Sequence, residues 1–149
     1  MSAQLKMSEE KRKNYNMNTF HLVILTPYGR YLDSQVTFLE VRNDKYSMGI
    51  TAGHAPLVST VSISKMKIRF PVGEYQYATG GGIINVEKEK VTLILDSIER
   101  SDEIDFDRAN ESMKRAKDRL EQREEEIDIV RAKSSLMRAL NRLDFKQNN

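Results

Sequence analysis

The chain has 149 residues, of which 31% are charged, and its formal net charge is only +2. A charge so close to balance supplies no strong basic field for nucleic acid, and the length predicts one or two small domains. Cysteine is absent, which excludes disulfide scaffolds, thiolate chemistry and cysteine-ligated zinc. No apolar run approaches the roughly 20 residues of a membrane-spanning helix, so we expect membrane association only through a partner.

The first segment, residues 1–16, carries four basic side chains but no apolar stretch after them. A secretory signal needs such a stretch. We therefore interpret this segment as a disordered extension or as residues upstream of the true start codon, with a functional basic arm as a third alternative. Strong patterning begins only at Met17.

The composition changes sharply near Ile98. Residues 17–98 contain eight Lys or Arg and seven Asp or Glu, whereas residues 99–149 contain twelve and thirteen. All seven glycines and all three prolines precede this change. We therefore predict a β domain over residues 17–100 and a helical domain over residues 101–149.

The first half has the pattern of short strands separated by turn residues. Residues 65–70 alternate charged and apolar side chains at every step, which is typical of a half-buried strand. The other predicted strands are rich in apolar and β-branched residues, and they cover residues 19–26, 36–42, 75–79, 83–86 and 91–95. Short strands with frequent turn signals predict a sandwich or barrel rather than βαβ units.

The second half switches to a helical period. Its apolar residues recur at alternating intervals of three and four in two sets, namely Phe106, Ala109, Met113, Ala116 and Leu120, and then Ile129, Ala132, Leu136, Ala139 and Leu143. Each set forms a narrow apolar stripe on a charged helix, and alanine at alternate positions lets two such helices approach closely. This pattern predicts an antiparallel hairpin of two helices.

The connector between the predicted helices, residues 121–126, contains no turn former. Glutamate and glutamine favour helix, so nothing local forbids one long helix. The second helix also has another apolar face, formed by Ile127, Val130 and Met137, which continues the phase of the first stripe. Two interpretations stay open: a plain hairpin with a wide buried face, or an element that is folded or extended according to its contacts.

Several segments resemble the epsilon subunits of F-type ATP synthases. Residues 48–57 contain the Gly-Ile and Gly-His-Ala-Pro-Leu elements of that family, and residues 77–86 are similar to its second Gly-rich strand passage. Residues 104–109 and 138–143 are similar to its C-terminal helices. The resemblance extends in order over residues 17–143.

This resemblance implies an α+β protein in two halves, with an N-terminal ten-stranded antiparallel β-sandwich and a C-terminal antiparallel two-helix hairpin. It implies a non-catalytic rotor subunit whose partners are the gamma subunit, the c-subunit ring and the catalytic alpha/beta head. Such a subunit lies at the cytoplasmic face of the bacterial membrane and meets the membrane only through the complex. In bacterial members, the hairpin can rise along gamma and inhibit ATP hydrolysis.

The resemblance also implies a nucleotide site, because the pattern Ile-Asp-x-x-Arg-Ala is similar to a motif that binds ATP in some bacterial epsilon subunits. Guanidinium groups suit phosphate oxygens, and two arginines spaced i, i+4 share one helical face. ATP is then a regulatory ligand, and no cofactor is required. The residues expected at this site are Glu99, Ile104, Asp105, Arg108, Ala109, Arg115, Arg138 and Arg142.

Several of these residues also fit roles that need no nucleotide. Asp105 lies where a helix N-cap is expected, and a second copy of the motif at residues 127–132 favours capping for at least one of the two. The arginines can form a solvated charged face. Alternatively, Arg131, Arg138 and Arg142 form a basic row, and the resemblance implies that in an extended arm this row contacts acidic residues of the catalytic β subunit in the head.

No residue set suggests catalysis or a metal site. The chain has two histidines and no cysteine, and we expect a structural role for His54 in its Gly-His-Ala-Pro loop. The glycines at residues 80–82 lack the Lys-Ser/Thr of a phosphate loop, so we expect a bulge or a close backbone approach there.

Two rival classes are an adaptor that binds proteins or nucleic acid and a small β-sandwich hydrolase. The balanced charge and the scarcity of aromatic residues in the second half argue against nucleic acid. The sequence contains no credible pair of nucleophile and base for a hydrolase.

Overall fold

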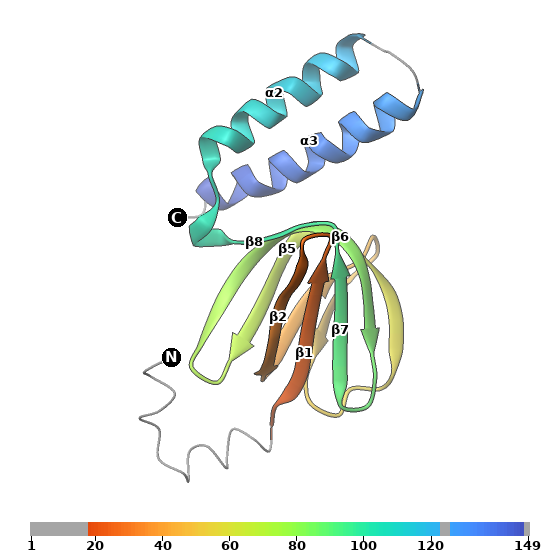
Figure 1. The fold of residues 1–149 in the computed structure, drawn as a ribbon, viewed down its shortest axis with the longest axis vertical. Coiled ribbons are helices and arrows are strands. Elements are labelled where there is room, and N and C mark those ends of the chain that lie inside the picture. Colours follow the sequence, from red (N-terminus) through yellow and green to blue (C-terminus); the bar gives the residue numbers. More distant parts are fainter. Residues whose placement is uncertain (1–17, 123–125, 148–149) are drawn as a thin grey trace. The chain divides into compact units, whose positions relative to one another are not determined.

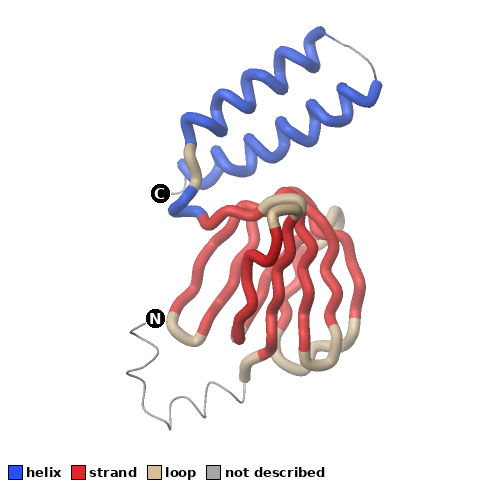
Figure 2. Tube along the Cα trace, viewed as in Figure 1, coloured by secondary structure: helices blue, strands red, loops and turns tan. Residues whose placement is uncertain are grey.

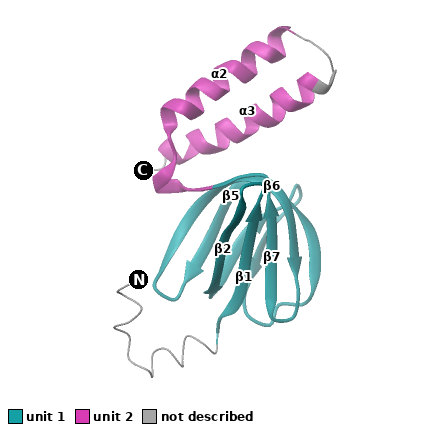
Figure 3. Cartoon of the chain, viewed as in Figure 1, with its two compact units in different colours: residues 1–98 teal, residues 99–149 magenta. Residues whose placement is uncertain are grey.

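The structure is a computed structural model that describes residues 18–122 and 126–147 (Figures 1 and 2). The predicted extension at residues 1–16, and half of the predicted connector between the helices, lie outside the described residues. The chain divides into two compact units, of which the first ends at Ile98 and the second begins at Glu99 (Figure 3).

The sandwich is built from strands that pair in the order β2-β1-β7-β6-β5-β3-β4, with β8 paired to β6. Their bounds are β1 (Phe20–Thr26), β2 (Gly29–Val36), β3 (Phe38–Arg42), β4 (Ser47–Ile50), β5 (Leu57–Phe70), β6 (Gly73–Val86), β7 (Lys90–Leu95) and β8 (Ile98–Arg100). Figure 1 shows β1 and β7 side by side, and the two strands run parallel. The sheet is therefore mixed.

The sandwich class is as predicted, but the expected ten antiparallel strands are wrong in number and partly in direction. The described residues form eight strands, because β5 and β6 are each 14 residues long and pass through both layers. Residues 57–61 of β5 pair with the half of β6 that also pairs with β7, whereas residues 67–69 pair with β3. Five strands separate β1 from β7 along the chain, so no tight hairpin turn restricts this pair to the antiparallel direction.

Alternating residues of the strands form one hydrophobic core. In β5, Met66 and Ile68 are 1% and 0% exposed, and the intervening Lys67 and Arg69 both form ion pairs with Glu74. The predicted alternation over residues 65–70 is therefore confirmed. The largest fully buried side chains include Leu22, Ile24, Leu39, Ile50, Ile84, Leu93 and Leu95.

A glycine run lets β6 approach its neighbours closely. Gly81 has a φ of +87°, and a Cβ on Gly82 would lie 1.9 Å from the carbonyl oxygen of Ile94. The N–H of Asp96 donates to the carbonyl of Gly81 at 2.9 Å. This confirms the close backbone approach predicted for residues 80–82, and only glycine fits it.

The second unit contains a short 3-10 turn, η1 (Ser101–Glu103), and two helices, α2 (Phe106–Gln122) and α3 (Glu126–Gln147). The predicted interface alanines of both helices are between 0% and 3% exposed: Ala109, Ala116, Ala132 and Ala139. The two-helix domain is therefore confirmed, with its helices in close contact along the alanine stripes. Ile104 and Phe145 are also buried in this unit.

Neither of the helices over the described ranges combines the length and the apolar character needed to cross a membrane.

Candidate functional site

A groove of about 230 Å³ runs between α2 and α3, entirely within the helical unit. Its lining contains four arginines and, among the described residues, no acidic side chain. Each guanidinium presents several N–H donors in a fixed fork, so such a groove attracts phosphates and carboxylates. The lining residues are Ser112, Arg115, Ala116, Arg119, Ser135, Arg138 and Arg142.

Helical periodicity positions the two central guanidiniums. Nη2 of Arg115 donates to the hydroxyl of Ser112 at 3.1 Å, and Nη2 of Arg138 donates to the hydroxyl of Ser135 at 3.3 Å. In each case the serine lies three residues earlier on the same helical face. Both side chains are thereby oriented within the groove before any ligand arrives.

The two outer arginines differ in their partners. Nε of Arg142 donates to a carboxylate oxygen of Glu99, and both side chains are partly buried. Arg119 has no hydrogen bond or ion pair with any residue in the described part of the chain. One outer guanidinium is thus neutralised by a carboxylate, whereas the other has no carboxylate partner among the described residues.

Asp105 caps α2. The backbone N–H of Arg108 donates to Oδ1 of Asp105 at 3.0 Å, which is the expected bond from an N-cap residue to the third residue of a helix. Asp128, the equivalent residue in the second copy of the motif, lies inside α3. Capping therefore accounts for one copy of the motif.

The structure brings only part of the predicted nucleotide set together. Arg115, Arg138 and Arg142 line the groove, and Glu99 contacts it through Arg142. Arg131, predicted as part of a basic row, is exposed and outside the lining.

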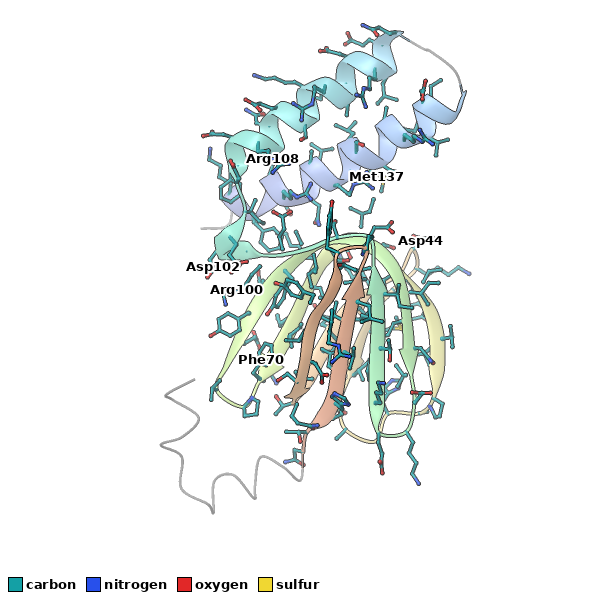
Figure 4. The ribbon with its side chains drawn as sticks, viewed as in Figure 1. Asp44, Phe70, Arg100, Asp102, Arg108 and Met137 are labelled. Carbon is teal, nitrogen blue, oxygen red and sulfur yellow. The ribbon has the colours of Figure 1, made fainter. Side chains whose placement is uncertain are left out.

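The other predicted residues have different positions. Ile104 and Ala109 are buried in the packing of the helical unit. Asp105 is exposed and occupied by its capping bond. Arg108 is exposed on the first turn of α2 and is not among the lining residues (Figure 4).

The prediction missed four lining residues, Ser112, Ala116, Arg119 and Ser135. An internal repeat would have found them. Residues 104–120 and 127–143 both follow the pattern Ile-Asp-x-x-Arg-Ala-x-x-Ser-x-x-Arg-Ala-x-x-Arg-Leu. The recurrence of Ile-Asp-x-x-Arg-Ala predicts only the start of this repeat, whereas the Ser, Arg and Arg that follow recur at the same offset.

An exposed apolar row crosses the outer face of the sandwich. Ile94 of β7 lies in register with Ile83 of β6 on one side and with Leu25 of β1 on the other. Val58 of β5 lies near them and is 70% exposed, and Ile83 and Ile94 are about half exposed. We call these four residues the outer apolar row. Contiguous exposed apolar residues are typical of a protein interaction surface.

A second exposed apolar face lies on α3. Val130, Met137 and Leu140 are 61%, 53% and 47% exposed although both helices are packed through their alanines (Figure 4 labels Met137). The hairpin therefore does not use the additional apolar face that the sequence predicts. The side chain of Ile127, the other predicted member, lies outside the described part of the helix.

Asp33 lies in a small charged cluster on β1 and β2. It is joined to Nε2 of His21 at 2.5 Å and accepts a hydrogen bond from Nη1 of Arg30 at 2.9 Å. The hydrogen bond with His21 is the largest influence on the pKa of Asp33 and lowers it. Desolvation, the next largest, raises that pKa, and the charges of His21, Arg30 and Lys90 lower it further, so it lies below its usual value. The cluster is exposed, so its effect on stability is modest.

His54 has a local role in its loop, because its Nδ1 is bonded to the carbonyl of Ala55 at 2.7 Å. Within the described ranges, no three His, Asp or Glu side chains are grouped so that they can hold a metal ion.

Family comparisons agree with this architecture of a sandwich followed by a helical pair. Residues 19–101 match the family described as ATP synthase, Delta/Epsilon chain, beta-sandwich domain. Residues 102–147 match ATP synthase, Delta/Epsilon chain, long alpha-helix domain. The chain therefore belongs to the ATP synthase delta/epsilon chain family, whose two domains it contains in order.

Among its relatives are the ATP synthase epsilon chains of Bacillus mycoides (strain KBAB4) and Bacillus cereus (strain B4264). Each is 37% identical over 107 residues, which cover 72% of this chain and 80% of the relative. Because it belongs to this family, the chain is a non-catalytic subunit of ATP synthase.

Two solved structures share the fold. One is a chain of the Euglena gracilis mitochondrial ATP synthase, OSCP/F1/c-ring in rotational state 1, with a TM-score of 0.67 and 20% identity over 80% of this chain and 76% of that chain. The other is a chain of the Tetrahymena thermophila mitochondrial ATP synthase central stalk/c-ring, with a TM-score of 0.54 and 16% identity over 83% of this chain and 93% of that chain. At these identities the likeness concerns the fold alone.

Proposed function

We propose that this chain is a rotor subunit of the bacterial ATP synthase central stalk, and that its helical hairpin is a regulatory arm which inhibits ATP hydrolysis and responds to ATP. The proposal places it peripherally at the cytoplasmic face of the membrane, held there by the complex. The observation that carries the regulatory part is the convergence of four arginines from two helices on one groove.

The sandwich is the proposed anchor. The outer apolar row offers an exposed surface that a partner can cover, and we assign it to the gamma subunit. The c-subunit ring is the second proposed partner of the sandwich. Each fully covered aliphatic side chain would stabilise such a contact by about 1.5–3 kcal/mol before the costs of association.

The groove links nucleotide binding to the conformation of the arm. Its lining comes from both helices, so it exists only while α2 and α3 pack side by side. If the arm became one continuous helix, Arg115 and Arg138 would lie about 35 Å apart, at 1.5 Å for each residue between them. A ligand that contacts both arginines therefore favours the folded arm by its differential affinity.

The extended arm has its own proposed contacts. The exposed face formed by Val130, Met137 and Leu140 would be covered by gamma or the catalytic head. Arg131, Arg138 and Arg142 would contact acidic residues of the head. Two of these arginines also line the groove, so ATP in the groove and the head compete for the same guanidiniums. ATP would then relieve inhibition.

Reconstitution with the catalytic head tests the proposal. Hydrolysis rates are compared for the full chain, for a truncation ending at Glu103, and for the double variant Arg138→Gln/Arg142→Gln. We expect the truncation to raise hydrolysis and the double variant to weaken inhibition while both still assemble. Equal rates for all three proteins at low ATP concentration would contradict the inhibitory role.

The nucleotide part is measured on the isolated full chain by calorimetry with ATP up to millimolar concentration. We expect saturable heat that Arg138→Gln reduces and that Lys133→Gln, an exposed change on the same helix outside the groove, leaves intact. Absence of any heat from the unaltered chain would reject ATP regulation but not the anchoring role of the sandwich.

A further inference from the structure

A thioether lies in the middle of the exposed apolar face of α3. Met137 is 53% exposed, and it lies between Val130, two helical turns before it, and Leu140, one turn after it (Figure 4). Ala132 and Ala139, through which α3 packs against α2, are 1% and 0% exposed and lie on roughly the opposite side of the helix. The close packing of the hairpin through its alanines therefore does not depend on Met137.

Exposure distinguishes Met137 from the other methionines of the described residues. Met48 and Met66 are 7% and 1% exposed in the core of the sandwich, and Met113 on α2 is partly buried. A hydroperoxide must reach the sulfur atom to oxidise it, so the rates of oxidation should follow solvent exposure. Met137 should therefore react before the other three.

We propose that Met137 is a reversible oxidation site at which a hydroperoxide relieves the inhibition exerted by the arm. The inference rests on the inhibitory function proposed above and adds a chemical regulator to it. A lone pair of the thioether sulfur attacks the terminal oxygen of the peroxide, so that an S–O bond forms and the O–O bond breaks. Sulfur is oxidised by two electrons, and the other peroxide oxygen takes up the proton and leaves as water or an alcohol.

The sulfoxide affects one conformation of the arm more than the other. Oxidation converts an apolar side chain into a polar one. In the folded hairpin this group stays in water and leaves the alanine interface intact. In the extended arm, gamma or the catalytic head would cover it, and burial of a polar group without a partner should weaken that contact roughly 5- to 150-fold. Oxidation therefore favours the folded arm, and reduction restores inhibition.

The order of oxidation is tested on the isolated full chain with limiting hydrogen peroxide. The chain contains no cysteine, so its methionines are the most readily oxidised side chains. Peptide mass spectrometry follows the gain of one oxygen atom at each of them. We expect Met137 to react first, Met113 later, and Met48 and Met66 last, with unchanged helix content by circular dichroism. A rate at Met137 no higher than that at Met66 would overturn the proposal.

The effect on inhibition is measured after the peroxide has been removed and the treated chain has been reconstituted with an untreated catalytic head. Hydrolysis with the truncation ending at Glu103 gives the uninhibited rate, from which the ratio of inhibited to uninhibited complexes follows. We expect treatment to lower this ratio about fivefold or more for the unaltered chain and for the control Met113→Leu, and methionine sulfoxide reductases to restore it.

Two substitutions at the site separate its oxidation from that of the other methionines. Met137→Leu keeps an apolar side chain of similar volume without the sulfur, so peroxide should not change its ratio. Met137→Gln is polar and should have a lowered ratio without any peroxide.

The possible failures separate this inference from the proposed function. An equal effect of peroxide on Met137→Leu, or a Met137→Gln variant that inhibits as strongly as the unaltered chain, would overturn regulation through Met137 while the inhibitory function stands. If the untreated full chain and the truncation give the same hydrolysis rate, the inhibitory function and its regulation are both wrong.

Discussion

Replacing Ala116 by leucine tests whether close helix packing holds the arm folded. Ala116 is 2% exposed between α2 and α3. Leucine adds three carbon atoms to this packed interface, and overpacking of this kind costs about 1–3 kcal/mol. Since 1.4 kcal/mol is about a factor of ten, the ratio of separated to packed arm should rise by roughly 5- to 150-fold. The matched control is Lys117→Leu, which adds leucine at the neighbouring exposed position.

The separation of the helices can be measured by single-molecule energy transfer. The chain has no cysteine, so cysteines introduced at the exposed Asn110 and Lys133 are the only labelling sites. In a continuous helix these sites would be about 35 Å apart, because 23 residues separate them at 1.5 Å each. Packed helices hold them much closer. An Ala116→Leu distribution identical to that of the unaltered arm, or an equal shift in the control, would refute the argument from packing.

Two further predictions concern the sandwich. Gly82→Ala should strongly lower the denaturant midpoint of unfolding, because the new Cβ would clash with the carbonyl oxygen of Ile94. In the control Gly29→Ala, the new Cβ meets no atom within 4 Å, so the variant should lose only the stability that the strain of its positive φ costs. A Gly29 variant as unstable as the Gly82 variant would contradict the steric argument. Asp33→Asn should reduce the free energy of unfolding at neutral pH. The pKa of Asp33 in the folded protein is below its ordinary value of 3.8, so the ionised carboxylate stabilises the fold above pH 3.8. The difference between the two proteins should shrink as the pH falls below 3.8, and urea titrations across this range that show a constant difference would disprove the linkage.

The elements with a strong apolar period were predictable from the sequence, and those without it were not. Strand β5 alternates strictly over residues 65–70, and the helical stripes repeat at three and four, so both were found. Strand β2 was missed because, between Gly29 and Val36, only Val36 is fully buried and the remaining side chains are mostly polar. The parallel direction of β1 and β7 was also missed, because alternation within a strand carries no information about the direction of its neighbour.

The site was predictable only in part, for a related reason. The arginines Arg115, Arg138 and Arg142 were proposed from resemblance, whereas Arg119 was not, although it is the repeat equivalent of Arg142. Which side chains line the groove depends on which faces of the two helices meet, and the alanine stripes determine those faces. With the alanine interface and the repeat considered together, Arg119 falls on the same side as Arg115. The ion pair between Glu99 and Arg142 joins residues 43 positions apart and could not be read from local spacing.

The two long strands of the sandwich have a mechanical consequence. Because β5 and β6 belong to both layers and pair along nearly their whole length, the layers cannot be pulled apart at a flexible loop. Load applied to one layer passes to the other through unbroken polypeptide and a row of antiparallel backbone bonds that must yield together. The sandwich should therefore resist torsion as one rigid unit. In a single-molecule force experiment it should unfold in one rupture event rather than two.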